Sequence, residues 1–148
     1  MDQQPLGFLL AAVGQQAMSA FRSRLEPLGI HPRAYAVLLA VSEGSDPSQR
    51  DLSRALALPA SRMVGLLDGL QDDGLIERTP DPGDRRTHRV RLTDHGRHTV
   101  DRLQAEASAL DDSMIADLSE DDRDRLRELL TRVSTRLAQE GTAPSRLW

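Results

Sequence analysis

One segment of this sequence breaks the helical pattern that surrounds it. The tetrapeptide Asp81-Pro82-Gly83-Asp84 is a strong turn signal, because proline presets one central dihedral angle and glycine accepts the positive φ that follows. Residues 89–92 then alternate, which places Val90 and Leu92 on one face of a strand and two arginines on the other. Residues 75–92 are therefore predicted to form a two-stranded hairpin with a basic tip.

Four helices are predicted before this hairpin. Apolar side chains recur every three or four residues over residues 6–25, which indicates one long amphipathic helix. Three shorter helices follow, and Ser48 with Asp51 resembles a capping box at the start of the third. The helix limits are marked by Pro27 and Gly29, by Pro32 and Gly44, by Ser48, and by Pro59 and Gly74.

Two long helices are predicted after the hairpin. Thr93 begins the first, whose apolar stripe consists of Val100, Leu103, Ala107, Leu110 and Met114. Ser119 and Asp122 begin the second, whose stripe consists of Leu126, Leu130, Val133 and Leu137. Residues 141–148 are expected to form a loose tail.

This order of elements is that of a winged helix-turn-helix, a mainly α fold with a small β-hairpin wing. A length of 148 residues suits a single domain, with the winged helix-turn-helix over residues 32–97. The helices at 5–28 and 98–140 carry more apolar surface than so small a central unit covers, which predicts a homodimer. The residues expected at the dimer interface are Leu6, Leu10, Leu126, Leu130 and Leu137.

The charge distribution favours an anionic partner at the hairpin. The net charge of -4 argues against nucleic acid, but the charges are segregated. Residues 85–97 hold five arginines and one acid, whereas residues 111–124 hold seven acids and one arginine. One face is therefore predicted to bind an anion and another to be kept away from it.

The sequence lacks the residues that several classes of enzyme and metal-binding protein require. Without cysteine, the chain has no disulfide, thiolate zinc site or cysteine nucleophile, and it shows no nucleophile elbow or phosphate-cradling glycine loop. His95 and His98 have a spacing compatible with a metal, but no third ligand is evident. We therefore expect no enzyme activity, cofactor or metal. Gln15 and Gln16 end the first apolar run too early for a membrane span, which predicts a cytoplasmic protein.

The chain resembles the MarR (multiple antibiotic resistance regulator) family. The resemblance is carried, in the family's order and spacing, by Leu70, Gly74-Leu75-Ile76-Glu77-Arg78, Asp84-Arg85-Arg86, Arg91-Leu92-Thr93-Asp94-His95-Gly96-Arg97 and Leu118-Ser119-Glu120-Asp121-Asp122. It implies a dimer held by the first and last two helices, which binds pseudo-palindromic double-stranded DNA operators. It also implies a repressor that loses DNA affinity when a small phenolic or lipophilic effector binds, although activation is a family variant.

The resemblance implies that the fourth helix contacts the major groove. If its apolar residues face the core, the opposite side presents Ala60, Ser61, Arg62 and Gly65 to DNA. A bidentate contact from Arg62 to guanine is worth about 1 to 3 kcal/mol of discrimination. Gly65 and Gly69 depart from the commoner family pattern of polar or basic side chains. Either they allow a close approach to a groove or neighbour, or this protein contacts fewer bases directly.

The resemblance also assigns roles to the hairpin. Asp84 and Arg86 match the family's Asp-x-Arg signature, in which the acid holds the wing and the arginine enters the minor groove, where narrow A·T-rich DNA favours it. Further wing contacts are expected from Arg85, His88 and Arg89. The residues expected at phosphates are Ser48, Gln49 and Arg78, of which Arg78 is also expected to brace the wing.

An effector pocket is expected near the junction of the first two helices. The residues predicted to line it are Met18, Phe21, His31, Arg33 and Tyr35. A second interpretation of the whole chain is a winged-helix module that binds protein rather than DNA, which the net acidity and the two glycines favour. Steep salt dependence of duplex binding distinguishes the two.

Overall fold

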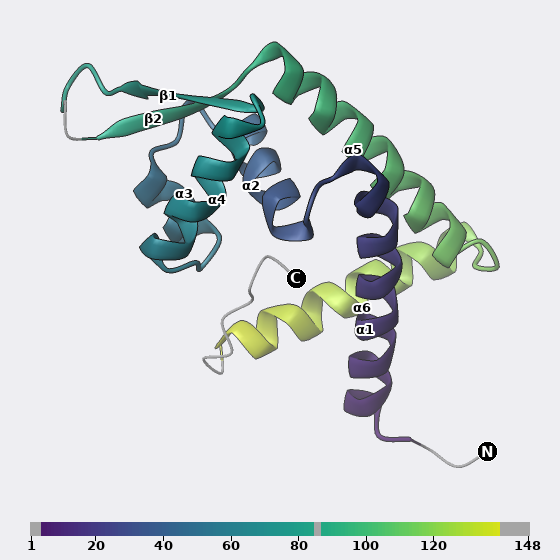
Figure 1. Ribbon diagram of the computed structural model, residues 1–148. Coiled ribbons are helices and arrows are strands. Elements are labelled where there is room, and N and C mark those ends of the chain that lie inside the picture. Colours follow the sequence, from purple (N-terminus) through teal and green to yellow (C-terminus); the bar gives the residue numbers. More distant parts are fainter. Residues whose placement is uncertain (1–3, 85–86, 140–148) are drawn as a thin grey trace.

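The computed structural model describes residues 4–84 and 87–139, and its elements follow the predicted order (Figure 1). The elements are α1 (Leu6–Leu25), the short 3-10 helix η1 (Glu26–Leu28), α2 (Pro32–Glu43), α3 (Gln49–Ala55), α4 (Ala60–Asp72), β1 (Ile76–Pro80), β2 (His88–Leu92), α5 (Asp94–Met114) and α6 (Glu120–Gln139). The mainly α fold with one hairpin is thus confirmed. The predicted tail at 141–148 lies outside the described residues.

The helices begin and end where capping chemistry predicts. Ser48 and Asp51 form a reciprocal capping box at α3, and the Thr93 hydroxyl accepts the Gly96 N–H at the start of α5, at 3.0 Å. At the end of α4, Gly74 adopts a φ of 69°, a left-handed conformation that ends the helix. These local signals account for the agreement between predicted and observed limits.

The core lies where α2, α3, α4 and the hairpin meet α1 and α5. Leu25, Leu38, Met63, Leu67 and Leu103 are fully buried there. The core is mostly aliphatic, as the scarcity of aromatic residues requires. Because α5 passes from the wing to the far end of the molecule, it connects the hairpin rigidly to α1 and to the turn before α6 (Figure 1).

The hairpin is hydrogen-bonded to the connection between α2 and α3 as well as within itself. β1 and β2 pair antiparallel in the register Ile76↔Leu92 to Pro80↔His88. An isolated bridge joins Ser48 to Arg89, and the Val90 N–H donates to the Pro47 carbonyl at 2.9 Å. The wing is therefore hydrogen-bonded to the α2–α3 connection, which fixes its orientation relative to the helices.

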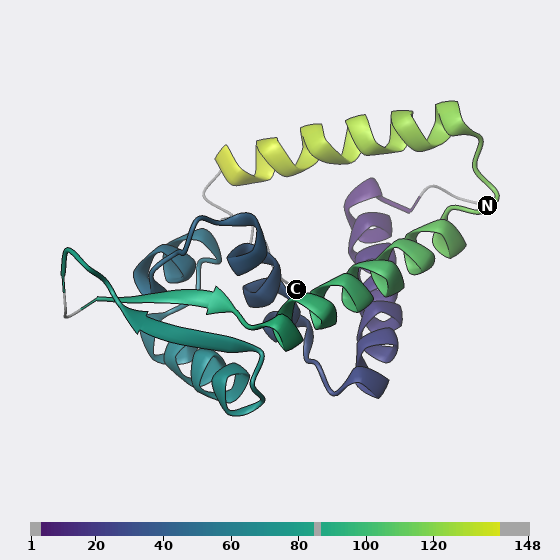
Figure 2. The ribbon, with the colours of Figure 1, turned by 90° about the horizontal axis from the view of Figure 1, so that it is seen from above.

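α6 stands apart from the rest of the chain. It buries none of its residues, and Figure 2 shows it running clear of the other elements. Its apolar stripe is exposed, as is that of the first half of α1, where Leu6 is 76% exposed. None of the described helices is long and apolar enough to cross a membrane.

Candidate nucleic-acid interface

α4 has one buried and one solvent-facing side. Met63, Leu67 and Leu70 pack into the core, whereas the four residues predicted to face the major groove are exposed: Ala60, Ser61, Arg62 and Gly65. Within the described residues Arg62 makes no ion pair. Its guanidinium is therefore free to bind an external acceptor such as a guanine edge.

Gly65 and Gly69 face open space. A Cβ built on either residue meets no atom within 4 Å. Close approach to another part of the described chain therefore does not explain these glycines. Close approach to an external surface, or a reduced number of base contacts, remains the prediction.

Arg78 joins the wing to α4. Its Nε donates to Gln71 Oε1 at 2.8 Å, and its Nη2 donates to Asp68 Oδ1 at 2.5 Å. The pair neutralises Asp68, an acid on the exposed side of α4 that would otherwise repel phosphate. Arg78 thus lies in a bracing position, and two of its donor groups are already occupied.

The tip of the wing is organised by two aspartates. Asp81 Oδ1 accepts the backbone N–H groups of Gly83 and Asp84, at 2.6 and 3.1 Å, in the pattern of an Asx turn. Asp84 Oδ2 accepts the Thr87 hydroxyl at 3.0 Å, and the Thr87 N–H donates to the Asp84 carbonyl. Predicted wing residues Arg85 and Arg86 lie outside the described residues.

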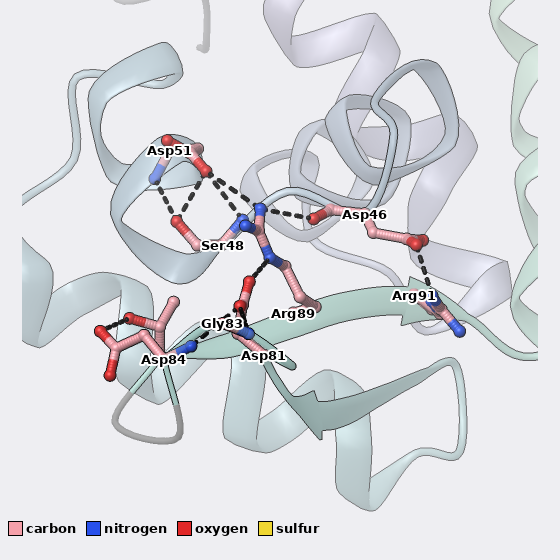
Figure 3. Close-up of polar contacts among 9 residues, drawn as sticks. Asp46, Ser48, Asp51, Asp81, Gly83, Asp84, Arg89 and Arg91 are labelled. Carbon is pink, nitrogen blue, oxygen red and sulfur yellow. Dashed lines mark hydrogen bonds and ion pairs between the residues drawn. The ribbon is translucent and has the colours of Figure 1, made fainter.

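Arg89 links the wing to the start of α3, as Figure 3 shows. Its Nε binds the Asp81 carboxylate, and its Nη1 donates to the Asp46 carbonyl at 3.3 Å and lies 4.0 Å from Asp51 Oδ2. The hydrogen bond from Arg89, followed by that from the Gly83 N–H, lowers the pKa of the Asp81 carboxyl. Arg89 therefore holds the wing in place as well as adding positive charge to it.

A second arginine of β2 reaches the same connection. Arg91 Nη2 donates to Asp46 Oδ2 at 2.5 Å, beside the Arg89 contact (Figure 3). Asp46 has a φ of 54°, which turns the chain between α2 and α3 and lets both its carbonyl and its carboxylate meet β2. Neither Asp46 nor Asp81 is among the residues predicted from the sequence to act at the site.

The structure separates the three residues predicted to contact phosphate. Gln49 and Arg78 line one open hollow of about 310 Å³ between α3, α4 and the wing, together with the predicted wing residue His88. Ser48 is different: it is buried, and both its N–H and its hydroxyl are bonded to Asp51 Oδ2. Those hydrogen bonds lower the pKa of Asp51. A phosphate at the start of α3 would need donors other than Ser48.

The acidic segment lies at the other end of the molecule. Residues 111–124 form the end of α5, the turn and the start of α6, which Figure 1 places opposite the wing. The negative charge is therefore far from α4 and the hairpin. This separation keeps the most acidic segment of a chain of net charge -4 away from the side proposed to meet DNA.

The comparisons with known proteins agree with this geometry. A model of the MarR family matches residues 28–87, from η1 through the wing tip. The solved structure of a transcriptional regulator (MarR family) from Rhodococcus sp. RHA1 is 30% identical, with a TM-score of 0.75, over 86% of this chain and 92% of that one. The chain belongs to the MarR family.

Two structures of another similar protein, the repressor CouR from Rhodococcus jostii RHA1, complete the MarR-family comparison. One is bound to a 23-mer DNA duplex; it is 27% identical, covers 90% of this chain and 99% of that chain, and has a TM-score of 0.81. The other is bound to p-coumaroyl-CoA; it is 31% identical, covers 88% of this chain and 92% of that chain, and has a TM-score of 0.74.

A second concave site lies between α1, α2 and α5 of this MarR-family chain. This α1–α2–α5 pocket has a volume of about 310 Å³ and is mainly apolar. Three of the predicted effector residues line it, namely Met18, Phe21 and Tyr35, and the rings of Phe21 and Tyr35 lie 5.6 Å apart.

Two of the predicted pocket residues do not line this pocket. His31 caps α2 instead, where its Nδ1 accepts the Arg33 N–H at 3.1 Å, and both side chains are exposed. Helix capping thus accounts for His31. The residues missed by the prediction come largely from α5, chiefly Leu110, Asp111 and Met114. The apolar spacing of Leu110 and Met114 predicted that they lie on a helix, but not which other helices pack against that side of it.

Proposed function

We propose that this protein is a homodimeric transcriptional repressor that binds pseudo-palindromic double-stranded DNA in the cytoplasm. The observation that carries the proposal is the free side of α4, with Arg62 exposed, next to a wing braced by Arg78 and Arg89. A helix inserts into the major groove only if its outer side is unobstructed. The likeness to CouR bound to a DNA duplex supports the same role.

The proposed protomer contacts are the exposed apolar stripes of α1 and α6. Leu6, Leu10, Leu126, Leu130 and Leu137 are between 38% and 76% exposed. A second copy would cover them, because a monomer rarely leaves so much contiguous apolar surface in water. In a dimer, two α4 helices would face successive major grooves, which accounts for a palindromic target.

The proposed regulation is release of DNA when a small effector occupies the α1–α2–α5 pocket. The pocket lies where α5, which continues directly from β2 through Thr93, packs against α1 and α2. A ligand there would alter the α5 position and therefore the distance between the two wings of a dimer. The structure of CouR bound to p-coumaroyl-CoA supports ligand-dependent relief.

The decisive experiment is an anisotropy titration of full-length protein into labelled duplex from its own upstream region, beside random duplex. Affinity should fall steeply between about 50 mM and about 200 mM salt, because phosphate contacts release counterions. Arg62→Ala should lose preference for the upstream duplex, whereas Arg127→Ala, which removes a distant α6 arginine, should bind as the wild type does. Absence of duplex binding by a folded dimer would instead favour a winged-helix protein-interaction module.

A further inference from the structure

The α1–α2–α5 pocket carries an unbalanced negative charge. Asp111 lines the pocket, and within the described residues its carboxylate makes no ion pair or side-chain hydrogen bond. Asp111 also lines the adjacent hollow, together with two arginines, Arg123 and Arg127. They bind elsewhere: Arg123 donates to the Leu118 carbonyl and Arg127 to Asp124. The Asp111 charge therefore remains available to a ligand.

Tyr35, which also lines the pocket, is affected by the negative charge of Asp111. Burial raises the pKa of its phenol, and the charges of Glu43 and Asp111 raise it further. Two carboxylates thus act on one phenol hydroxyl, which keeps its proton and remains a hydrogen-bond donor. No lysine or arginine is among the residues that line the described pocket.

The rest of the lining is apolar. Met18, Phe21, Leu39, Leu110 and Met114 provide thioether, aromatic and aliphatic surface. A volume of about 310 Å³ holds roughly ten non-hydrogen atoms, at the ~30 Å³ that a water molecule occupies in the liquid. An apolar body of one ring and a short chain fits this space.

We infer that the α1–α2–α5 pocket selects a small lipophilic amine, whose ammonium group pairs with Asp111 and whose apolar body packs against Phe21 and the methionines. A carboxylate or phenolate of the same shape is disfavoured, because it would meet Asp111 with no cation among the lining residues to balance it. This assignment rests on the proposed ligand-responsive function, and it names the charge class of the effector.

The test uses three probes that share one apolar body: phenylbutylamine, phenylbutanol and phenylbutyrate. Each is titrated calorimetrically into the full-length protein without DNA. The amine should bind about fivefold to tenfold more tightly than the alcohol, and the acid most weakly. Asp111→Asn should lower amine affinity to that of the alcohol and leave alcohol binding unchanged. Asp112→Asn, which changes an adjacent acid outside this pocket, should leave the order of affinities unchanged.

Equal affinities for amine and acid, no binding of any probe, or an amine affinity unaffected by Asp111→Asn would overturn the inference. A parallel titration of the amine into the protein–duplex complex separates this result from the proposed function. If the amine binds through Asp111 but leaves the duplex bound, the charge assignment is supported and ligand-dependent release is contradicted. If duplex never binds, only the calorimetric result bears on the pocket.

Discussion

Arg78 on β1 and Asp68 on α4 form an ion pair, with 2.5 Å between Nη2 and Oδ1. The pair ties the wing to the helix proposed to enter the major groove. It also removes a negative charge from that helix, so its importance for DNA binding should exceed its importance for stability. An exposed pair of this kind contributes about 0 to 1 kcal/mol to folding.

The first prediction separates bracing from direct phosphate contact at Arg78. Arg78→Gln should weaken duplex binding about fivefold to tenfold, because Asp68 then faces the phosphates unpaired. Asp68→Asn added to that variant should restore most of the affinity. If Arg78 instead contacts phosphate directly, the double variant will bind no better than Arg78→Gln, and the salt slope will fall by about one charge. Anisotropy titrations of the wild type, Arg78→Gln and the double variant at several salt concentrations distinguish these cases.

The second prediction concerns acid and the anchoring of the wing. The pKa of Asp81 is lowered by Arg89 and by the backbone N–H of Gly83, so its charged form is favoured in the folded protein. A carboxyl with a lowered folded pKa stabilises the fold above its unfolded pKa of about 3.9, and this stabilisation disappears as pH falls through the folded pKa.

As the pH is lowered from about 6 to about 3, the thermal unfolding midpoint should therefore fall more steeply for the wild type than for Asp81→Asn. Asp101→Asn is the matched control, since Asp101 is exposed on α5 and makes no side-chain hydrogen bond within the described residues. It should follow the wild-type curve. Parallel curves for the wild type and Asp81→Asn would show that the Asp81 contacts do not contribute to the pH dependence of stability.

The agreement between sequence and structure is closest where the signals are local. Ser48 with Asp51, Thr93 with Gly96, and Gly74 each act within a few residues, so their chemistry was evident from spacing. The exposed side of α4 followed from the apolar period of the same helix. The Asp81 turn was predicted as a turn, but not its contact with Arg89.

Long-range pairings could not be predicted in the same way. Arg91 and Asp46 are 45 residues apart, and nothing in the spacing of either residue selects the other. The α5 residues that line the α1–α2–α5 pocket could not be predicted for a related reason, because α1 and α5 meet only in the folded chain. His31 was assigned to the pocket from its position at a helix junction, whereas the helix used its Nδ1 as a cap. The position of a residue along the chain can indicate that it lies near a site, but not which group its side chain will bind.

The third prediction compares two glycines that differ in their surroundings. A Cβ on Gly96 would lie 1.9 Å from the carbonyl oxygen of Leu75, the residue just before β1. Gly96→Ala should therefore destabilise the protein by about 1 to 3 kcal/mol. Gly69→Ala, in open space within α4, should stabilise it by up to about 1 kcal/mol through helix propensity. Urea unfolding measures both, and shifts of the same sign would contradict the described packing.

The fourth prediction concerns base discrimination by Arg62, which is exposed on α4 and has no ion-pair partner among the described residues. Arg62→Ala should reduce discrimination at one guanine of each half-site by about 1 to 3 kcal/mol, while affinity for random duplex changes little. Competition between the bound upstream duplex and single-base variants of it measures this loss. A uniform loss over all sequences would instead identify Arg62 as a phosphate contact.

The fifth prediction tests the proposed dimer surface through Leu130. This residue is 45% exposed on α6, within the apolar stripe that the isolated chain leaves uncovered. Leu130→Lys should place a charge in each protomer contact and convert the dimer to monomer at micromolar concentration, with duplex affinity falling as the two half-sites become independent. Thr131→Lys adds the same charge on the opposite side of α6 and should remain dimeric. Sedimentation velocity measures both, and an unchanged Leu130→Lys dimer would move the interface away from this stripe.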